Sequence, residues 1–424
     1  RLAANLGIKL PTLGWWTRVV HQATKRLPTA GRLEAIIQGP AIQASSSHRS
    51  EVSTADYCCQ IMRPLGIFDP LWAAKFRWTA VQEVKARGTF QTRMSLLIES
   101  AAAACFDRGG QRMESELLLH DVTKRVVDHG DPRLIGQLYS SIAYCHSLSL
   151  RWSQVREPTQ ISLDSYAVDA PGNAFAIAHA TWPQISADFF LGHWKSLQRH
   201  SEELMEEAIQ SNDIFRRVVA TTAMGGVAML VDDRPDRLAE ALQHDGLRSL
   251  RDSADMIRAM WMIAEVQRQT YLGEFDNASS TCLAFRRLLK RTYLGDIQLL
   301  RIQSIQFKGL LGLHQLTVSG GRVYVDQVRT AIRQLRGENN PFALVQGHFF
   351  EGLLHKQLGS VLTAVDSLQS AMILAADERL RPIHLAAQDA LAVIDDKNKR
   401  HSLIGRMERQ GVARPDRLRR LYTC

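Results

Sequence analysis

The apolar positions of this chain recur every three or four residues over most of its length, which is the spacing of amphipathic helices. No proline occurs between Pro70 and Pro132 or between Pro235 and Pro341, and a proline costs about 3 kcal/mol inside a helix. Runs in which apolar and polar residues alternate, as they do in β-strands, are scarce. The pattern therefore predicts an all-α chain, in which two apolar faces can be read directly: Trp194, Leu197, Leu204 and Ala208, and Val361, Val365, Leu368 and Met372.

A short turn motif repeats along the chain and marks the expected corners between helices. It reads Leu-Gly-x followed by an aromatic or apolar residue, and its clearest copies contain Gly192, Gly273 and Gly359. Degenerate copies near residues 110, 150, 232 and 321 make successive corners 40, 42, 40, 41, 48 and 38 residues apart. This regularity predicts an α-solenoid of about seven stacked helical hairpins with a period of about 40 residues. The packing would be similar to that of tetratricopeptide repeats, which have about 34 residues each. A compact, irregular helical domain is the alternative.

The residues of the corner motif have separate expected roles. Glycine is expected to end the first helix of a pair in a left-handed cap. The aromatic residue is expected to wedge between the two helices, and neighbouring hairpins must then stack, because no single pair can bury its apolar face alone. The predicted hinge and wedge residues are structural, and they are Gly110, Trp152, Gly192, Trp194, Gly273, Phe275 and Gly359.

The charge pattern separates the N-terminal part from the rest of the chain. The net charge is +9, but residues 1–50 contribute +6 and residues 397–424 contribute +7, so the body between them is mildly acidic. Residues 1–50 also contain three prolines and a Trp-Trp pair at the start of an amphipathic stretch. We therefore expect a basic junction with one amphipathic helix over residues 1–50, and a TPR-like helical-repeat domain over residues 51–424. That helix would pack on the repeats or lie on a membrane surface.

The distribution of charge and cysteine restricts the expected partners and compartment. Positive charge confined to the two ends argues against a nucleic-acid-binding face, which needs a continuous basic stripe. The longest uncharged stretch, residues 170–187, is too polar to span a membrane. Six cysteines without C-x-x-C spacing fit a reducing compartment, so we expect a cytoplasmic protein.

A search for catalytic motifs predicts no enzyme activity within this chain. It has no phosphate-binding glycine loop, no dinucleotide-binding fingerprint and no zinc-protease helix. Asp188-Phe189-Phe190 lacks the glycine of the kinase magnesium motif. Fourteen histidines show no pairing at metal-binding spacing. We therefore expect no catalytic residue, no cofactor and no metal.

A series of landmarks between residues 55 and 424 resembles one family. The landmarks are residues 65–69, 74–77, 109–110, 129–132, 190–192, 232–235 and 271–273, and the tail with Met407, Gln410, Gly411, Val412, Pro415, Arg417 and Leu418. In the order and spacing of these landmarks the chain resembles the C-terminal helical-repeat region of large bacterial serine/threonine protein kinases that carry a predicted AAA-type ATPase module. The tail departs from the family in ending Tyr422-Thr423-Cys424, where members more often end in Pro-Gly.

The resemblance implies a regulatory role rather than a catalytic one. The parent would phosphorylate proteins, and this portion would sense or dock a protein or peptide on the concave face of the repeats, with kinase and ATPase modules upstream in the same chain. No catalytic residue can be carried over, because the kinase and nucleotide-binding motifs are absent from this sequence. Two alternatives remain: the helical-repeat region of an ATPase-type transcriptional regulator, and a free-standing TPR-like scaffold.

Overall fold

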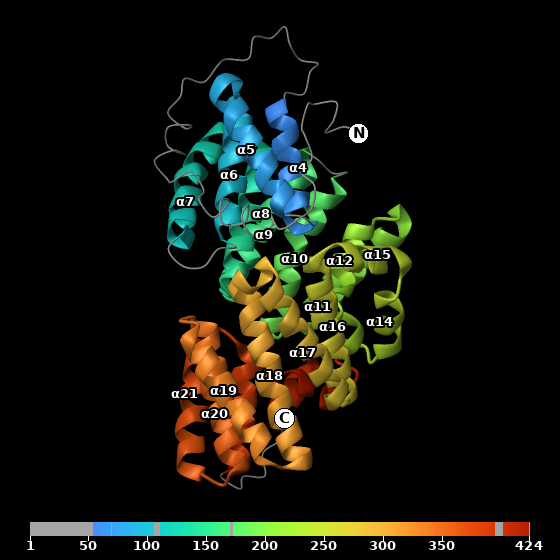
Figure 1. Ribbon diagram of the computed structural model, residues 1–424, viewed down its shortest axis with the longest axis vertical. Coiled ribbons are helices and arrows are strands. Elements are labelled where there is room, and N and C mark those ends of the chain that lie inside the picture. The colour runs from blue at the N-terminus through green and yellow to red at the C-terminus, as the bar shows by residue number, and fades with distance from the viewer. Residues whose placement is uncertain (1–53, 69, 106–110, 170–172, 395–401, 424) are drawn as a thin grey trace. The chain divides into compact units, whose positions relative to one another are not determined.

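The computed structural model describes residues 54–68, 70–105, 111–169, 173–394 and 402–423. The expected basic junction over residues 1–50 and the predicted hinge Gly110 lie outside these ranges. Within them every regular element is a helix, 21 of them α-helices and three of them 3-10 helices (Figure 1). The prediction of an all-α helical-repeat chain is confirmed.

By their internal contacts the residues fall into two compact units, and the single repeat domain expected over residues 51–424 stays a prediction. Unit 1 comprises residues up to Cys145 together with Ile161–Pro171, and unit 2 comprises His146–Gln160 and Gly172–Cys424. The backbone therefore enters unit 2 after Cys145, returns briefly to unit 1, and then stays in unit 2.

Unit 1 is built from antiparallel helix pairs. Helix α4 packs on α5, and α6 packs on α4 and α7. Two further helices, α8 and α9, continue into unit 2. The bounds are α4 Thr54–Phe68, α5 Pro70–Arg87, α6 Phe90–Ala104, α7 Gln111–His129, α8 Pro132–Leu148 and α9 Arg156–Asp169.

Unit 2 contains four long hairpins, α10/α11, α16/α17, α18/α19 and α20/α21. Their bounds are α10 Ala174–Leu191, α11 Trp194–Ser211, α16 Asp255–Leu272, α17 Phe275–Arg291, α18 Gln298–Ser319, α19 Arg322–Gly337, α20 Pro341–Gln357 and α21 Val361–Asp377. Shorter helices complete the unit: η1 Trp152–Gln154, α12 Ile214–Thr221, α13 Val227–Val231, α14 Pro235–Leu242, α15 Asp245–Ser253, η2 Tyr293–Asp296, α22 Arg381–Ile394, α23 Ser402–Arg409, α24 Pro415–Leu418 and η3 Arg419–Leu421.

The predicted corners that the structure describes all fall between helices. Gly192, Gly273 and Gly359 have φ angles of 72°, 84° and 75°, the left-handed conformation that a helix end needs and that glycine adopts without strain. The corners near residues 150, 232 and 321 likewise separate α8 from η1, α13 from α14 and α18 from α19. The spacing of the glycines in the sequence therefore marks the corners between successive helices.

Unit 2 closes on itself instead of remaining an open array. Trp152 at its beginning stacks on Phe190 of α10 with ring centroids 4.4 Å apart, and meets Phe342 of α20 edge-on at 6.3 Å. Asn340 donates a hydrogen bond to the carbonyl of Ser149 over 3.2 Å, and α10 contacts α22. The first and last hairpins of unit 2 thus touch.

The apolar face read from the sequence holds for α11 and in part for α21. Trp194, Leu197, Leu204 and Ala208 are all buried. In α21 Leu368 is buried as predicted, whereas Val361 is 53% exposed and the other buried side chains are small. At Leu368 the small residue lies on α20, since a Cβ at Gly352 would lie 2.6 Å from Cγ of Leu368.

This close approach predicts the effect of a single methyl group. Gly352→Ala is expected to lower the free energy of unfolding by about 1–2 kcal/mol, because the new Cβ overpacks the α20–α21 contact. Gly347→Ala on the same helix is the matched control, since its Cβ would meet Cγ of Arg336 at an ordinary 3.5 Å. It is expected to be neutral or to stabilise by up to about 1 kcal/mol through helix propensity. Urea unfolding of both variants measures the difference, and equal effects would contradict the prediction.

Candidate functional site

The inner helices of unit 2 are buried nearly all round. In α10 an unbroken run from Pro183 to Leu191 is buried, and in α18 the same holds from Ile302 to Phe307. Each inner helix forms a hairpin with an outer one: α10 with α11, α16 with α17 and α18 with α19. The outer helices bury only one stripe of side chains and expose the opposite face to solvent. A helix buried on every side needs cover on both of its faces, so something must occupy the inner side of α10, α16 and α18.

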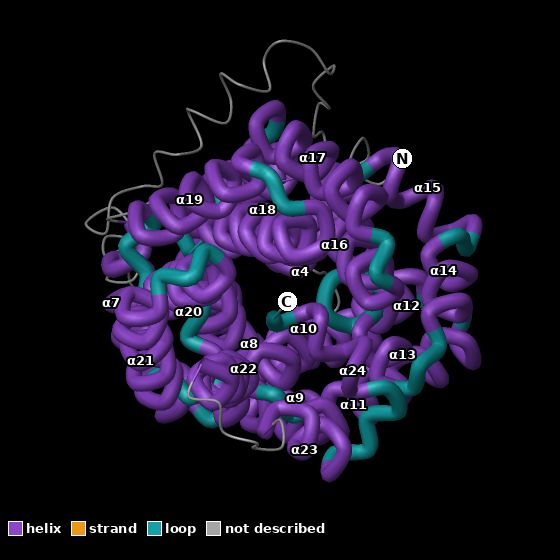
Figure 2. Tube along the Cα trace, turned by 90° about the horizontal axis from the view of Figure 1, so that it is seen from below, coloured by secondary structure: helices purple, strands orange, loops and turns teal. Residues whose placement is uncertain are grey.

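That cover is the chain's own C-terminal segment, residues 412–423. The segment enters where the backbone amide of Ala413 donates to the carbonyl of Val231 over 2.8 Å. Its helical turns α24 and η3 contact α16, and Leu418, Leu421 and Tyr422 are buried. Figure 2 shows the C-terminal end between α10, α16 and α18. The inner face that we expected to receive a partner therefore already holds a polypeptide segment.

Tyr422 is the aromatic anchor of this segment. Its hydroxyl donates to the carbonyl of Phe189 and accepts from the indole Nε1 of Trp194, both over 3.0 Å. Its ring stacks on the ring of Phe189 with centroids 5.1 Å apart. Burial raises the pKa of Tyr422 above its ordinary value, so the hydroxyl stays protonated and keeps its donor. Both hydrogen-bonding directions of the phenol are thus used.

Two arginines of the segment bind polar groups at the α16 corner. Arg417 Nη1 lies 3.0 Å from Oδ1 of Asp233, which also accepts from the hydroxyl of Tyr271 over 2.7 Å. Arg420 Nη1 donates to the backbone carbonyl of Tyr271 over 2.9 Å. The corner residue Gly273 makes room for Arg420, because a Cβ there would lie 3.1 Å from Nη1. The corner glycine therefore serves both the cap and this contact.

His314 of α18 holds the main chain of the segment. Its Nε2 lies 3.2 Å from the carbonyl oxygen of Arg420, and because a carbonyl only accepts, Nε2 must carry the hydrogen. Phe275 stacks on the imidazole with ring centroids 4.3 Å apart. Burial lowers the pKa of His314 to about 4. The imidazole is therefore neutral at neutral pH.

A small hollow lies beside the segment. It is partly open to solvent, and its interior has room for about one water molecule. The side-chain amide of Gln267 donates to Sδ of Met224 over 3.0 Å, whereas its carbonyl Oε1 is buried without a hydrogen-bond partner. The hollow is lined by three glutamines, apolar residues and Leu421 of the segment: Phe189, Phe190, Met224, Gln267, Thr270, Gln303, Gln306, Phe307, Leu310 and Leu421.

The predicted wedge residues pack against other hairpins or against the segment. Trp194 is fully buried against Tyr422, Phe275 lies on His314 of the next hairpin, and Trp152 joins α10 to α20. The spacing located these residues correctly at corners. It did not indicate their contacts, which involve residues far away in the sequence.

A buried carboxylate lies in the α10–α11 corner. Asp188 accepts from the side-chain amide of Gln184 over 2.8 Å, and its carboxylate lies 2.9 Å from Nδ1 of His200 and 3.5 Å from Nδ1 of His193. Burial opposes ionisation of Asp188, but the hydrogen bonds from the two imidazoles outweigh it and lower its pKa. In the described part of the chain no three His, Cys, Asp or Glu side chains are arranged to hold a metal ion. The carboxylate ties the corner to α11.

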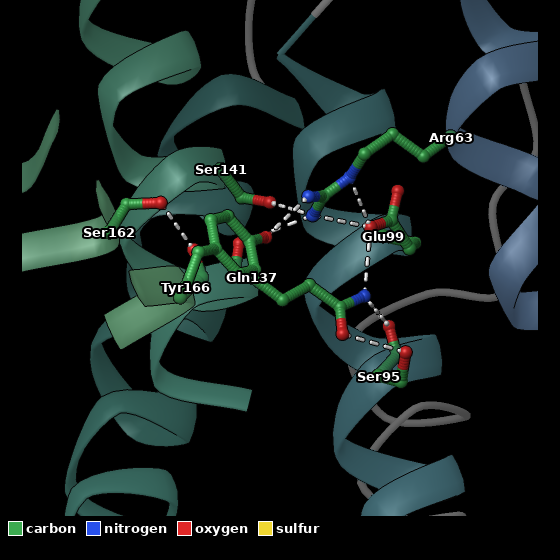
Figure 3. Close-up of polar contacts among 8 residues, drawn as sticks. Arg63, Ser95, Glu99, Gln137, Ser141, Ser162 and Tyr166 are labelled. Carbon is green, nitrogen blue, oxygen red and sulfur yellow. Dashed lines mark hydrogen bonds and ion pairs between the residues drawn. The ribbon is translucent and has the colours of Figure 1, made fainter. Parts of the chain in front are cut away.

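Unit 1 contains a second buried polar cluster, shown in Figure 3. Arg63 of α4 pairs with Glu99 of α6, with Nη2 and Oε1 2.6 Å apart and both side chains about 10% exposed or less. Arg63 also donates to the hydroxyls of Ser141 and Tyr166 and to the carbonyl of Gln137. The amide of Gln137 reaches Glu99 over 2.8 Å. These hydrogen bonds join the helices α4, α6, α8 and α9. The role of the cluster is therefore structural.

A disulfide joins Cys105 and Cys145 in unit 1, which the cysteine spacing did not indicate. Cys58, Cys59 and Cys282 are free and buried. Cys282 lies in the apolar stripe of α17, as its spacing predicts. Disulfides persist mainly in oxidising compartments, so a cytoplasmic location stays a prediction.

Comparison with known proteins leaves the family open. No protein-family model matches the chain, and neither the curated proteins nor the solved structures contain a match. None of the helices in the described ranges is long and apolar enough to cross a membrane.

The Arg63–Glu99 pair predicts a large effect from a small change. Glu99→Gln is expected to lower the free energy of unfolding by about 3–5 kcal/mol, because it leaves a buried guanidinium without its counter-charge. Glu203→Gln is the control, since Glu203 pairs with Arg199 on an exposed face of α11 and surface pairs contribute about 1 kcal/mol or less. Chemical unfolding measures both, and a loss at Glu99 no larger than at Glu203 would contradict the structural role.

The buried imidazole predicts a pH dependence of stability. Folded His314 stays neutral down to about pH 4, whereas the unfolded chain takes up this proton near 6.5. The unfolded state therefore binds more protons between these values, and the free energy of unfolding falls by up to about 3 kcal/mol as pH drops from 6.5 to 4. His314→Gln is expected to flatten this part of the profile, measured by urea unfolding at each pH. Parallel profiles for the two proteins would refute the assignment.

Proposed function

We propose that this chain is a non-catalytic protein-interaction module that receives a polypeptide segment on the inner face of unit 2. The single observation that carries this proposal is the C-terminal segment itself, seated on α10, α16 and α18 through specific contacts. A surface that binds one polypeptide segment in this way has the chemistry to bind another.

The contacts divide into the two kinds that peptide recognition uses. Main-chain hydrogen bonds from Ala413 and to the carbonyl of Arg420 hold the backbone independently of sequence. Side-chain contacts of Arg417 and Tyr422 add specificity, because each fills one place on the inner face. Buried aromatic and arginine anchors of this kind dominate the energy of most protein interfaces.

The family resemblance supports a finer proposal. The module would be the regulatory region of a bacterial serine/threonine protein kinase with an AAA-type ATPase module, and kinase and ATPase modules in the same chain would be its partners. Several landmarks of the resemblance are helix ends: Gly130, Gly192, Gly273 and Gly411 all have positive φ. They are capping devices whose order and spacing carry the likeness. The helical-repeat region of a transcriptional regulator and a free-standing scaffold remain the alternatives.

The experiment begins with the reading frame upstream of Arg1. A kinase signature set followed by a phosphate-binding loop is expected there, and those modules are then produced separately and mixed with this chain. Hydrogen exchange should change in the inner helices α10, α16 and α18 and in the segment over residues 412–423, with little change in the outer helices α11, α17 and α19. The purified chain alone should show no ATP hydrolysis and no protein phosphorylation.

Two outcomes would overturn parts of this proposal. An upstream frame without kinase motifs would remove the kinase parent and leave the alternatives. Protection confined to the outer helices would remove the inner face as the binding surface.

A further inference from the structure

The C-terminal segment has the properties of a separable ligand. Its helices α24 and η3 comprise four and three residues, and helices this short do not persist on their own in water. Its conformation therefore depends on the inner face that holds it. The segment joins α23 through Gly411, whose φ of 79° is the left-handed conformation found after a helix end.

The inner face offers three specific places to such a ligand. The first accepts a phenol between the carbonyl of Phe189 and the indole of Trp194. The second is the carboxylate of Asp233, which pairs with an arginine five residues before the phenol. The third is the carbonyl of Tyr271, which accepts from an arginine two residues before it. Together they select a basic segment with a tyrosine that follows two arginines at these spacings.

The resident segment leaves one polar group of the inner face unsatisfied. Leu421 lines the hollow in which Gln267 keeps its carbonyl Oε1 buried and without a hydrogen-bond partner. An apolar side chain cannot satisfy this acceptor, whereas a side chain with an N–H donor at the same position can. The resident segment is therefore not the best ligand that this face can hold.

From these contacts we propose that the C-terminal segment is a tethered competitor, which a partner segment of the same chemistry displaces. The partner carries a tyrosine with arginines two and five residues before it and a hydrogen-bond donor directly before it. This inference rests on the proposed function, since it names the ligand of the same surface. Tethering gives the resident segment an effective concentration on the order of millimolar, so that only a matching or better partner displaces it.

Fluorescence anisotropy with the full chain tests this proposal. The probe is a labelled synthetic peptide with the sequence of residues 412–423. Weak binding to the natural chain is expected, and about tenfold tighter binding to the Tyr422→Phe chain, whose own segment loses the hydrogen bonds of its hydroxyl. The same change made in the peptide should weaken its binding about tenfold. Replacing the leucine of the peptide that corresponds to Leu421 by glutamine should tighten it about threefold, because the new amide donates to Gln267.

The control is Tyr324→Phe, a change of the same chemistry on α19. No hydrogen bond or ring contact joins Tyr324 to the segment in the described residues, so this variant should bind the peptide as weakly as the natural chain. Tyr422→Ala provides a second, stronger release of the segment, and cooperative thermal unfolding confirms that each variant is folded. Equal affinity for all chains, or no binding to folded Tyr422 variants, would overturn the inference.

These outcomes are independent of the proposed parent. The peptide comes from this chain, so an upstream frame without kinase motifs would leave exchange of the segment intact. Upstream modules that bind to the inner helices without any exchange of the peptide would remove the competitor and keep the interaction function.

Discussion

The requirement for cover on both sides of the inner helices is the constraint on which unit 2 depends. Helices α10 and α18 bury residues around most of their circumference, and the outer helices can cover only one side of them. The C-terminal segment covers the other, with Tyr422 as its anchor. Closure of the unit through Trp152, which bridges α10 and α20, brings the inner helices round this segment. Structure and interaction thus use the same surface.

The same constraint explains why the candidate site is polar as well as apolar. A face that holds a polypeptide must satisfy its backbone groups, and His314 and the carbonyl of Val231 do so, while the carbonyl of Tyr271 accepts from the side chain of Arg420. A neutral imidazole suits this role, because a charged one would need water that the buried position excludes. The carboxylate of Asp233, shared between Tyr271 and Arg417, adds one charge at the rim. The inner face therefore binds the segment through a partly exposed ion pair between Asp233 and Arg417 and through the buried aromatic ring of Tyr422.

The buried polar clusters of the two units are structural where their charged groups are paired. The Arg63–Glu99 pair has hydrogen-bond partners on neighbouring helices and fixes their packing, and Asp188 is held by two histidines and Gln184. Gln184 and Gln267 both keep a buried carbonyl Oε1 without a hydrogen-bond partner. Of the two, Gln267 lines the hollow beside the segment. An incomplete network beside a short segment is where exchange costs least.

Local patterns in the sequence were enough to establish the helices and their corners. Glycine spacing located Gly192, Gly273 and Gly359 because a left-handed cap depends only on neighbouring residues, and the buried stripe of α11 followed from its period. The stripe of α21 was predicted only in part: Leu368 is buried where it packs against Gly352 of α20, but Val361 at the start of the helix is exposed. The Cys105–Cys145 disulfide, the closure through Trp152 and the seat of Tyr422 bring together residues 38 to 233 positions apart. No local period encodes such pairings, since only the path of the whole chain decides which corner meets which segment.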